Sequence, residues 1–442
     1  MYKIKENLSN FVIFFFIILF SFILIFGILK FSAHHSWGMK IILFSSLTLI
    51  FFIFIIFLKK KIKDFFVTVI ITSYSAFLFV NIYLETQIPS SKVHLDKLIE
   101  ELGLDFDKRS KIEVIYDLRK KNIKAYPSIY AGFLQTDIPG EILLQNNLYP
   151  LGGISNVTTV MCNESGSYSI YLSDKFGFNN DNDYYKKNNH IMLIGDSMVH
   201  GQCVNPGEDI AGYLRSKGFN AFSFGIASNG PLSELATIRE YGSYLKPKII
   251  LWFYHSNDVY DLNREIKTPI LKNYLKEDFY QTLISKQENI DSFLKTMFEE
   301  QLIKENEKEK EDKKQKNIKF NYRNIRSHLT LHNLRFFLNI SSATPDYKKF
   351  EKVMSLAKKE ANKIKATLYF IYLPDMRELH LSKNNKKLDK ILNKLDIETL
   401  NFTKILKETE DPLIYFPLRS MIHFNKYGYA FLGDVIINKI LK

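Results

Sequence analysis

Three long apolar runs open the chain. They cover Phe11 to Leu29, Ile41 to Leu58 and Phe65 to Leu84. Each run has about the length, roughly 20 residues, at which a helix crosses the hydrocarbon core of a bilayer. A cleaved signal peptide would explain only the first run, and no small-residue cleavage site follows it. The pattern therefore predicts a three-helix transmembrane anchor over residues 1–89.

The hydrophobic pattern changes twice between residues 90 and 187. Residues 90–130 place apolar side chains at helical spacing, whereas residues 135–187 are rich in turn formers such as Pro139-Gly140 and Gly152-Gly153. Short β-type runs, Tyr168 to Leu172 among them, lie within the second stretch. We expect a membrane-proximal helical segment that leads into a loop-rich one.

From residue 188 to residue 442, predicted strands and helices alternate. The strands are His190 to Ile194, Ala221 to Phe224, Lys248 to Tyr254 and Thr367 to Leu373. The helices between them are Asp209 to Lys217, Leu232 to Leu245 and Phe350 to Ile364. Because the strands are apolar without strict alternation, they indicate a parallel sheet covered on both faces. The predicted fold class is therefore an α/β sandwich.

A long insertion near residues 263–345 separates the third predicted strand from the fourth. Its stretch Lys304 to Lys319 consists almost entirely of Lys, Glu, Asp, Asn and Gln. Such a stretch has little apolar surface to bury. We expect a solvated helix or a disordered loop there rather than a binding element.

Charge and cysteine content exclude several classes of function. The net charge is +13, but the lysines are spread along the chain among many acids, which is typical of a solvated surface rather than a nucleic-acid groove. Cys162 and Cys203 are the only thiols, too few for a structural zinc site. We therefore expect no nucleic-acid partner, no metal and no cofactor.

The candidate chemistry begins at Gly195-Asp196-Ser197, directly after the first predicted strand. This position places the Ser197 hydroxyl at the carboxyl end of a parallel strand, where α/β folds build their sites. A serine hydroxyl is a poor nucleophile at neutral pH and needs a base, usually histidine. Capping of the following helix is the alternative role for Ser197.

Four sequence blocks resemble the SGNH (GDSL) hydrolase family, in the family's order, over Ile191 to Lys442. They are Gly195-Asp196-Ser197, Gly225 to Pro231, Ser256-Asn257-Asp258 and Ile422 to Tyr429. The resemblance implies that Ser197 is the nucleophile and His423 its base. It also implies an oxyanion hole formed by the Asn257 amide and the main-chain NH groups of Ser197 and Ser228.

The upstream part is similar to a subset of bacterial membrane-attached SGNH proteins whose substrate is unassigned. The similarity lies in Pro150 to Asn156, Cys162 to Glu164 and Ser173 to Asn179. It supports the fold more than the function.

Three positions depart from the family's pattern. Ser420 stands where the family often has the Asp that orients the catalytic imidazole. Asp258, Asp411 or a backbone carbonyl would have to take that role. Ser228 and Ser256 stand where the family usually has Gly, and a side chain is costly where the backbone adopts a positive φ.

The distribution of lysines predicts the orientation of the anchor. Lys3 and Lys5 precede the first apolar run, and Lys59, Lys60, Lys61 and Lys63 lie between the second and third. Positive flanks tend to stay in the cytoplasm, so the part after Leu84 is expected outside it, in the periplasm or at the surface of a bacterial cell, anchored in the inner membrane. In that oxidising compartment Cys162 and Cys203 are candidates for a disulfide; two buried thiols are the alternative.

Resemblance and topology together favour a membrane-anchored serine esterase or O-acyltransferase that acts on acyl esters of cell-envelope glycans. The transferase version would need a membrane acyltransferase as partner to bring the acyl group across the bilayer. The alternative is a catalytically inactive SGNH fold that binds polysaccharide or serves envelope assembly.

The predicted topology can be tested with reporters fused after Lys442. A reporter that works only outside the cytoplasm should be active, because the four lysines between the second and third runs hold that loop inside. Activity of a cytoplasm-only reporter at the same position would contradict the topology.

Overall fold

The computed structural model describes residues 2–30, 36–87, 92–314, 327–337, 345–374, 376, 379 and 386–442. Within it the chain forms two compact units. The first comprises residues 1–87 and 320–341, and the second comprises residues 88–319 and 342–442.

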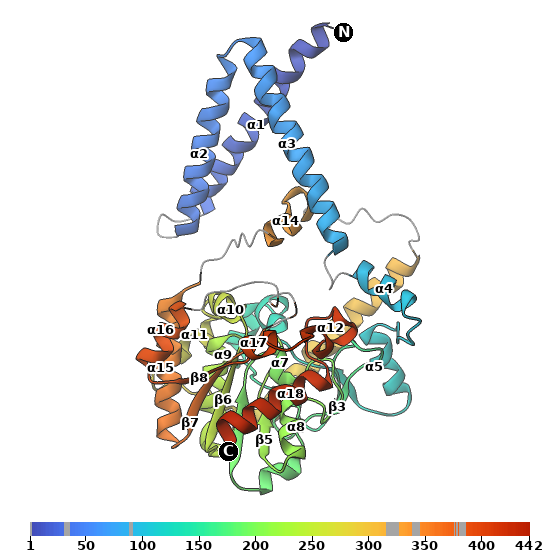
Figure 1. Cartoon of the computed structure of the whole chain (residues 1–442), viewed down its shortest axis with the longest axis vertical. Helices are drawn as coiled ribbons and strands as arrows, with labels where there is room; N and C mark the ends of the chain where they lie inside the picture. Colours follow the sequence, from blue (N-terminus) through green and yellow to red (C-terminus); the bar gives the residue numbers. More distant parts are fainter. Residues whose placement is uncertain are drawn as a thin grey trace. The chain divides into compact units, whose positions relative to one another are not determined.

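The first unit is built on the long helices α1 (Tyr2–Lys30), α2 (Ser36–Ile56) and α3 (Lys60–Gln87) (Figure 1). Many of their Phe, Ile and Leu side chains are exposed. By length and composition, Leu8–Ile25 and Lys60–Leu84 suit a membrane span, whereas the apolar part of α2, Ile42–Ile56, is shorter. Two apolar helices therefore support membrane anchoring, and a third crossing stays a prediction.

A short helix from the insertion, α14 (His332–Phe337), packs on α3 in this first unit. The buried Asn81 binds it on two sides: its backbone oxygen accepts from Asn333 Nδ2 at 3.2 Å, and its Oδ1 accepts from the Leu334 amide at 3.0 Å. A side-chain amide on an apolar helix is costly unless it is paired. The insertion therefore contributes to the apolar unit, which the sequence pattern did not predict.

The second unit contains a five-stranded parallel sheet in the order β5-β4-β6-β7-β8. The strands are β4 (His190–Ile194), β5 (Asn220–Ser223), β6 (Ile249–Tyr254), β7 (Thr367–Tyr372) and β8 (Glu398–Asn401). The first strand in sequence, β4, lies inside the sheet between β5 and β6. The parallel α/β architecture predicted from the sequence is confirmed.

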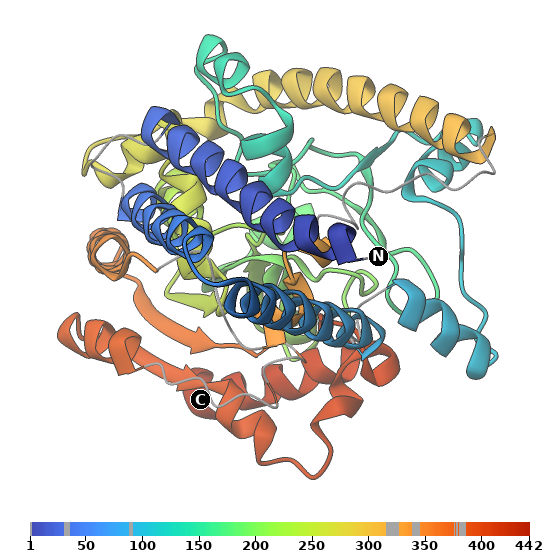
Figure 2. The same ribbon diagram turned by 90° about the horizontal axis from the view of Figure 1, so that it is seen from above.

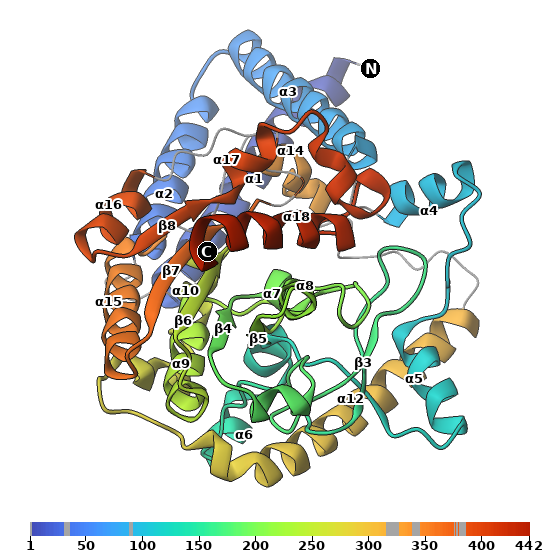
Figure 3. The ribbon, with the colours of Figure 1, turned by 60° about the horizontal axis from the view of Figure 1, so that its bottom comes forward.

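Helices cover both faces of this sheet (Figure 3). On β4, Met192 and Ile194 face a core shared with α9 (Pro231–Leu245) and α15 (Tyr347–Lys363). Ile191 and Leu193 alternate with them and face the core that contains α8 (Ile210–Ser216) and α18 (Lys426–Ile436). Burial on both sides explains why the strands read as continuous apolar runs.

Apart from α12 (Gln287–Lys314), the remaining α-helices of the second unit are shorter than α9 and α15. They are α4 (Lys92–Glu101), α5 (Lys111–Lys120), α6 (Gly140–Gln145), α7 (Ser197–His200), α8 (Ile210–Ser216), α10 (Asp258–Glu265), α11 (Pro269–Lys272), α16 (Lys386–Lys394), α17 (Phe402–Lys407) and α18 (Lys426–Ile436).

A second, small sheet lies in the loop-rich part of the chain. Its strand β2 (Thr158–Val160) pairs in parallel with β1 (Ala125–Pro127) and antiparallel with β3 (Ile170–Leu172). Helix α5 packs against it through a small core of its own. The β2–β3 hairpin is the element that matters for the site, because its loop carries residues 161–169.

The charge-rich part of the insertion is helical as far as it is described. Helix α12 (Gln287–Lys314) is long and unbroken (Figure 2). Its first half buries one stripe at four-residue spacing, through Ile290, Leu294, Phe298 and Leu302. For the stretch Lys304 to Lys319, where a solvated helix or a disordered loop was expected, the structure has a helix up to Lys314. Residues 315–319 lie outside the described residues.

Candidate active site

Three of the residues singled out in the sequence lie at one edge of the large sheet, at the carboxyl ends of its strands. Ser197 follows β4, Ser228 follows β5, and Asn257 follows β6. Because these strands are parallel, their carboxyl ends lie at the same edge. The strand order changes direction at β4, and such a switch point is where open α/β sheets form their binding sites.

The turn that presents Ser197 is tightly packed. Asp196 caps α7 by accepting a hydrogen bond from the Met198 amide at 3.1 Å. Two glycines let α7 come close to the strands: a Cβ on Gly195 would lie 2.6 Å from Val199 Cγ2, and one on Gly225 would lie 2.4 Å from the His200 nitrogen. These close approaches hold the start of α7, and with it Ser197, against the ends of β4 and β5.

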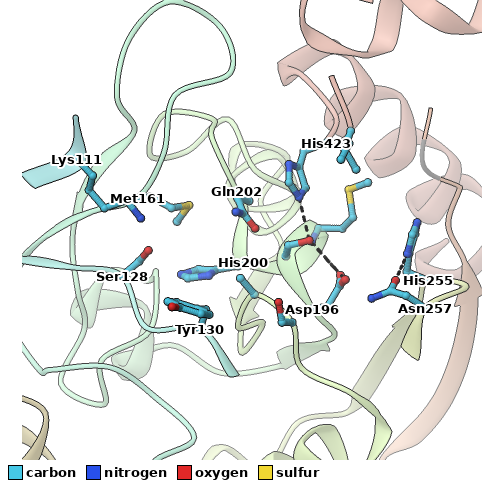
Figure 4. Close-up of a pocket in the computed structure, with 15 residues that line it drawn as sticks. Lys111, Ser128, Tyr130, Met161, Asp196, His200, Gln202, His255, Asn257 and His423 are labelled. Carbon is cyan, nitrogen blue, oxygen red and sulfur yellow. Dashed lines mark hydrogen bonds between the residues drawn. The ribbon is translucent and has the colours of Figure 1, made fainter. Parts of the chain in front are cut away.

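A chain of two hydrogen bonds joins Ser197, His423 and Glu164. The Ser197 Oγ lies 3.0 Å from His423 Nε2 (Figure 4), and His423 Nδ1 lies 2.7 Å from Glu164 Oε1. The His423 and Glu164 side chains are only 12% and 11% exposed. A carboxylate can only accept, so Nδ1 carries the proton and donates it to Glu164. The lone pair on Nε2 then faces the serine hydroxyl, as a general base requires.

His423 is positioned by the helix that follows it. Asn425 caps α18 by accepting from the amides of Tyr427 and Gly428, both at 3.0 Å. Further along α18, the Tyr429 hydroxyl donates to the Met198 carbonyl at 2.9 Å. Helix α18 is thereby tied to the helix that begins at the nucleophile.

Glu164 reaches the site from the loop of the β2–β3 hairpin. A disulfide joins Cys162 in this loop to Cys203, with the two Cα atoms 4.9 Å apart. The Ser169 amide closes the loop by donating to the Cys162 carbonyl at 2.8 Å. The bridge therefore ties the loop that carries the acid to the segment that follows the nucleophile.

Glu164, Cys203 and His423 also form a group whose donor atoms lie within 4.8 Å of one another. Metal ions bind cysteine as a thiolate. Because the Cys203 sulfur is bonded to Cys162, this group offers two ligands rather than three. The donor set does not fit a metal centre.

The hypothesis that Asp258 or Asp411 orients His423 is wrong in this structure. Asp411 forms an ion pair with Arg419 Nη1 at 2.7 Å on the surface. Asp258 is fully buried, and its Oδ2 accepts from the His255 amide at 2.8 Å. The position beside His423 Nδ1 belongs to Glu164, which sequence reasoning did not single out as an acid.

Ser228 and Asn257 line the same cavity as Ser197. Ser228 adopts the left-handed region with φ 63°, the conformation that explains the glycine usual at this position in the resembling family. Asn257 donates from Nδ2 to Asp261 Oδ2 at 2.8 Å and accepts through Oδ1 from His255. Its amide nitrogen carries two protons, so one remains for a bound oxygen.

Buried acids lie beneath this site. Glu234 and Asp258 are both fully buried. Burial, followed by the charge of neighbouring carboxylates, raises the pKa of each well above the ordinary range. Burial also raises the pKa of Asp261 to about 6. Protonated forms are therefore favoured in this cluster, and a structural role explains Asp258.

The chain shows only distant likeness to solved structures. A lipolytic protein of the G-D-S-L family from Desulfitobacterium hafniense DCB-2 is 11% identical with a TM-score of 0.31, over 56% of this chain and 97% of that one. A lipase/acylhydrolase from Enterococcus faecalis is 10% identical with a TM-score of 0.31, over 57% and 95%. The esterase EstA from Pseudoalteromonas sp. is 10% identical with a TM-score of 0.28, over 57% and 97%.

No protein-family model matches the sequence, and no curated protein matches it. Sequence identities and TM-scores this low do not assign the chain to a family or a function. The function proposed below therefore rests on the geometry of the site.

The role of Glu164 can be tested by Glu164→Gln. Glutamine keeps the shape but loses the charge, and its amide NH₂ can hold the imidazole in the wrong tautomer. We expect turnover of p-nitrophenyl acetate by the full chain in detergent to fall on the order of 10³- to 10⁴-fold, with the unfolding midpoint little changed. Asp411→Asn is the matched control and should retain activity; equal losses in the two variants would contradict the assignment.

The buried acids predict how stability depends on pH. An acid whose folded pKa is raised stabilises fully below its unfolded pKa, near 4, and loses that contribution as the pH rises towards the folded value. The thermal midpoint should therefore fall between pH 5 and pH 8. Glu234→Gln should reduce this fall, whereas the exposed Glu410→Gln should not. An identical pH profile in wild type and Glu234→Gln would show that this buried acid does not cause the fall.

Proposed function

We propose that this chain is a membrane-anchored SGNH-type serine esterase or O-acyltransferase that acts on acyl esters of cell-envelope glycans. The observation that carries the proposal is the hydrogen-bonded set Ser197, His423 and Glu164, which opens on a cavity of about 410 Å³. Nucleophile, base and orienting acid are the three parts that acyl transfer by a serine needs.

The first half-reaction forms an acyl-enzyme. Ser197 Oγ attacks the ester carbonyl while His423 Nε2 accepts the hydroxyl proton, and the Glu164 carboxylate stabilises the imidazolium that results. The carbonyl π electrons move to oxygen, which then faces the main-chain NH groups of Ser197 and Ser228 and the Asn257 amide. Removing one such donor typically costs about 3 to 4 kcal/mol of transition-state stabilisation. Collapse of the tetrahedral intermediate breaks the ester bond, and the alcohol leaves with the proton from His423.

The second half-reaction decides between hydrolysis and transfer. An acceptor oxygen gives its proton to His423 Nε2 and attacks the acyl carbon, and Ser197 takes the proton back as it leaves. A water molecule as acceptor makes the chain an esterase. A sugar hydroxyl makes it an acyltransferase.

Two features support an envelope substrate. Two apolar helices at the start of the chain suit a bilayer. The three crossings predicted from the sequence, with the N-terminus inside, would put the site outside the cytoplasm. The disulfide between Cys162 and Cys203 fits an oxidising compartment. Acyl esters on envelope glycans are available to a site in that location.

The binding-protein alternative depended on the missing acid at Ser420. Glu164 occupies the place of that acid, so the absence no longer argues against catalysis. A chain without turnover remains an outcome of the test below.

The proposal predicts that Ser197→Ala abolishes acyl release from acetylated model glycans. Ser197 lies at a sheet edge next to a cavity, so alanine should leave the unfolding midpoint and membrane insertion nearly unchanged. The measurement is acetate release or transfer by the full chain in detergent, with the exposed Ser216→Ala as control. Undiminished activity in Ser197→Ala would remove the serine mechanism. A wild type inactive on every ester would favour the binding protein.

A further inference from the structure

The cavity extends beyond the residues that acyl transfer uses. Besides Ser197, His423 and the oxyanion donors, its wall contains Lys111, Ser128, Tyr130, His200 and Gln202. Figure 4 shows Lys111 and Ser128 across the cavity from Asp196 and Asn257. The cavity therefore has a catalytic end and a second polar end, which is defined by these five residues.

Lys111 supplies the positive charge at the second end. It is the first residue of α5, directly after the capping residue Ser110, and is partly buried. Among the described residues, its Nζ has no hydrogen-bond or ion-pair partner. Burial lowers the pKa of Lys111, and the charge of Glu305 only partly opposes this. An ammonium held away from water without a partner is costly, and a bound anion would offset that cost.

His200 supplies an independent observation at the same end. It is fully buried, and its Nε2 lies 3.0 Å from the Tyr171 hydroxyl. Its Nδ1 is buried with no hydrogen-bond partner among the described residues. Burial lowers the pKa of His200 to about 3, so the ring is neutral. When the Tyr171 hydroxyl donates to Nε2, Nδ1 carries a proton that a bound oxygen can accept.

Gln202 is a second residue of the cavity wall with a buried, unpaired polar atom. It lines the cavity, and its Oε1 is buried without a hydrogen-bond partner among the described residues. Buried polar atoms are usually paired, so several unpaired ones along one cavity wall indicate a ligand with polar groups of its own.

We infer that the second end binds an anionic substituent of the glycan, a carboxylate or a phosphate, whose acyl ester lies at Ser197. The inference rests on the proposed function and names its substrate class: acyl esters of acidic glycans. The nearby acids do not oppose it, because Asp196 caps α7 and Glu164 binds His423, both at the catalytic end. A neutral sugar would leave Lys111 unpaired.

The first experiment compares two substrates that differ only in the acid. For the full chain in detergent, kcat/KM should be at least about 10-fold higher for O-acetylated methyl galacturonoside than for O-acetylated methyl galactoside. Lys111→Met should bring this ratio towards one, mainly through KM for the acidic ester. Lys111→Arg should keep most of the preference, and the exposed Lys108→Met should keep all of it. A ratio of one in the wild type, or one unchanged by Lys111→Met, would overturn the inference.

The second experiment does not depend on turnover. Binding of the same two glycosides to the Ser197→Ala chain is measured by saturation-transfer NMR, with inorganic phosphate as competitor. Preference for the uronate that is lost in Ser197→Ala/Lys111→Met supports the inference with a carboxylate, and displacement by phosphate alone supports it with a phosphate. Equal binding of both sugars without competition by phosphate overturns it. An acid preference in binding without turnover in the wild type would instead overturn the proposed function and leave the anion site standing.

Discussion

The hydrogen bond between Glu164 and His423 is the contact on which the site depends. It joins residues 259 positions apart in the sequence, one in a hairpin loop and one before the last long helix. A carboxylate that is 11% exposed is stable only with a partner, and an imidazole acts as a base only when its tautomer is fixed. The same hydrogen bond therefore gives the buried Glu164 carboxylate a partner and fixes the His423 tautomer that can accept a proton.

Several local constraints hold the two partners of this bond in place. The disulfide fixes the hairpin loop against the segment after Ser197, and the Tyr429 hydroxyl fixes α18 against the carbonyl of Met198. These contacts meet at the short helix α7, at the end of β4, and at the turn that follows it. The site residues come from segments that are distant in the sequence. These contacts hold them in place relative to β4, an inner strand of the sheet.

The parallel sheet could be predicted from the sequence because its inner strands are buried on both faces and therefore appear as unbroken apolar runs. The edge strand β8 (Glu398–Asn401) was missed, since Leu400 is its one buried residue and gives no such run. Ser197, Ser228 and Asn257 were found through motifs that follow strand ends, and His423 through a motif that leads into α18. The structure brings all four to one cavity.

Glu164 could not be found in the same way. It lies on a separate small sheet, and no spacing rule links it to His423. Its only signal in the sequence was its place two residues after Cys162. Asp258 was a weaker candidate than its position suggested, because full burial beside Glu234 makes it a structural acid. The distal Lys111 lacked any motif, and only the folded cavity relates it to Ser197.

We propose that His423 and Glu164 activate Ser197. Fluorophosphonates react with a serine only when a base raises its nucleophilicity, so the direct measurement is peptide mass spectrometry after treating the full chain with such a reagent. We expect one adduct, on Ser197, formed rapidly in the wild type, slowly in Glu164→Gln and not at all in His423→Ala. An unlabelled Ser197 in the wild type, or labelling that is equally fast in all three proteins, would contradict it.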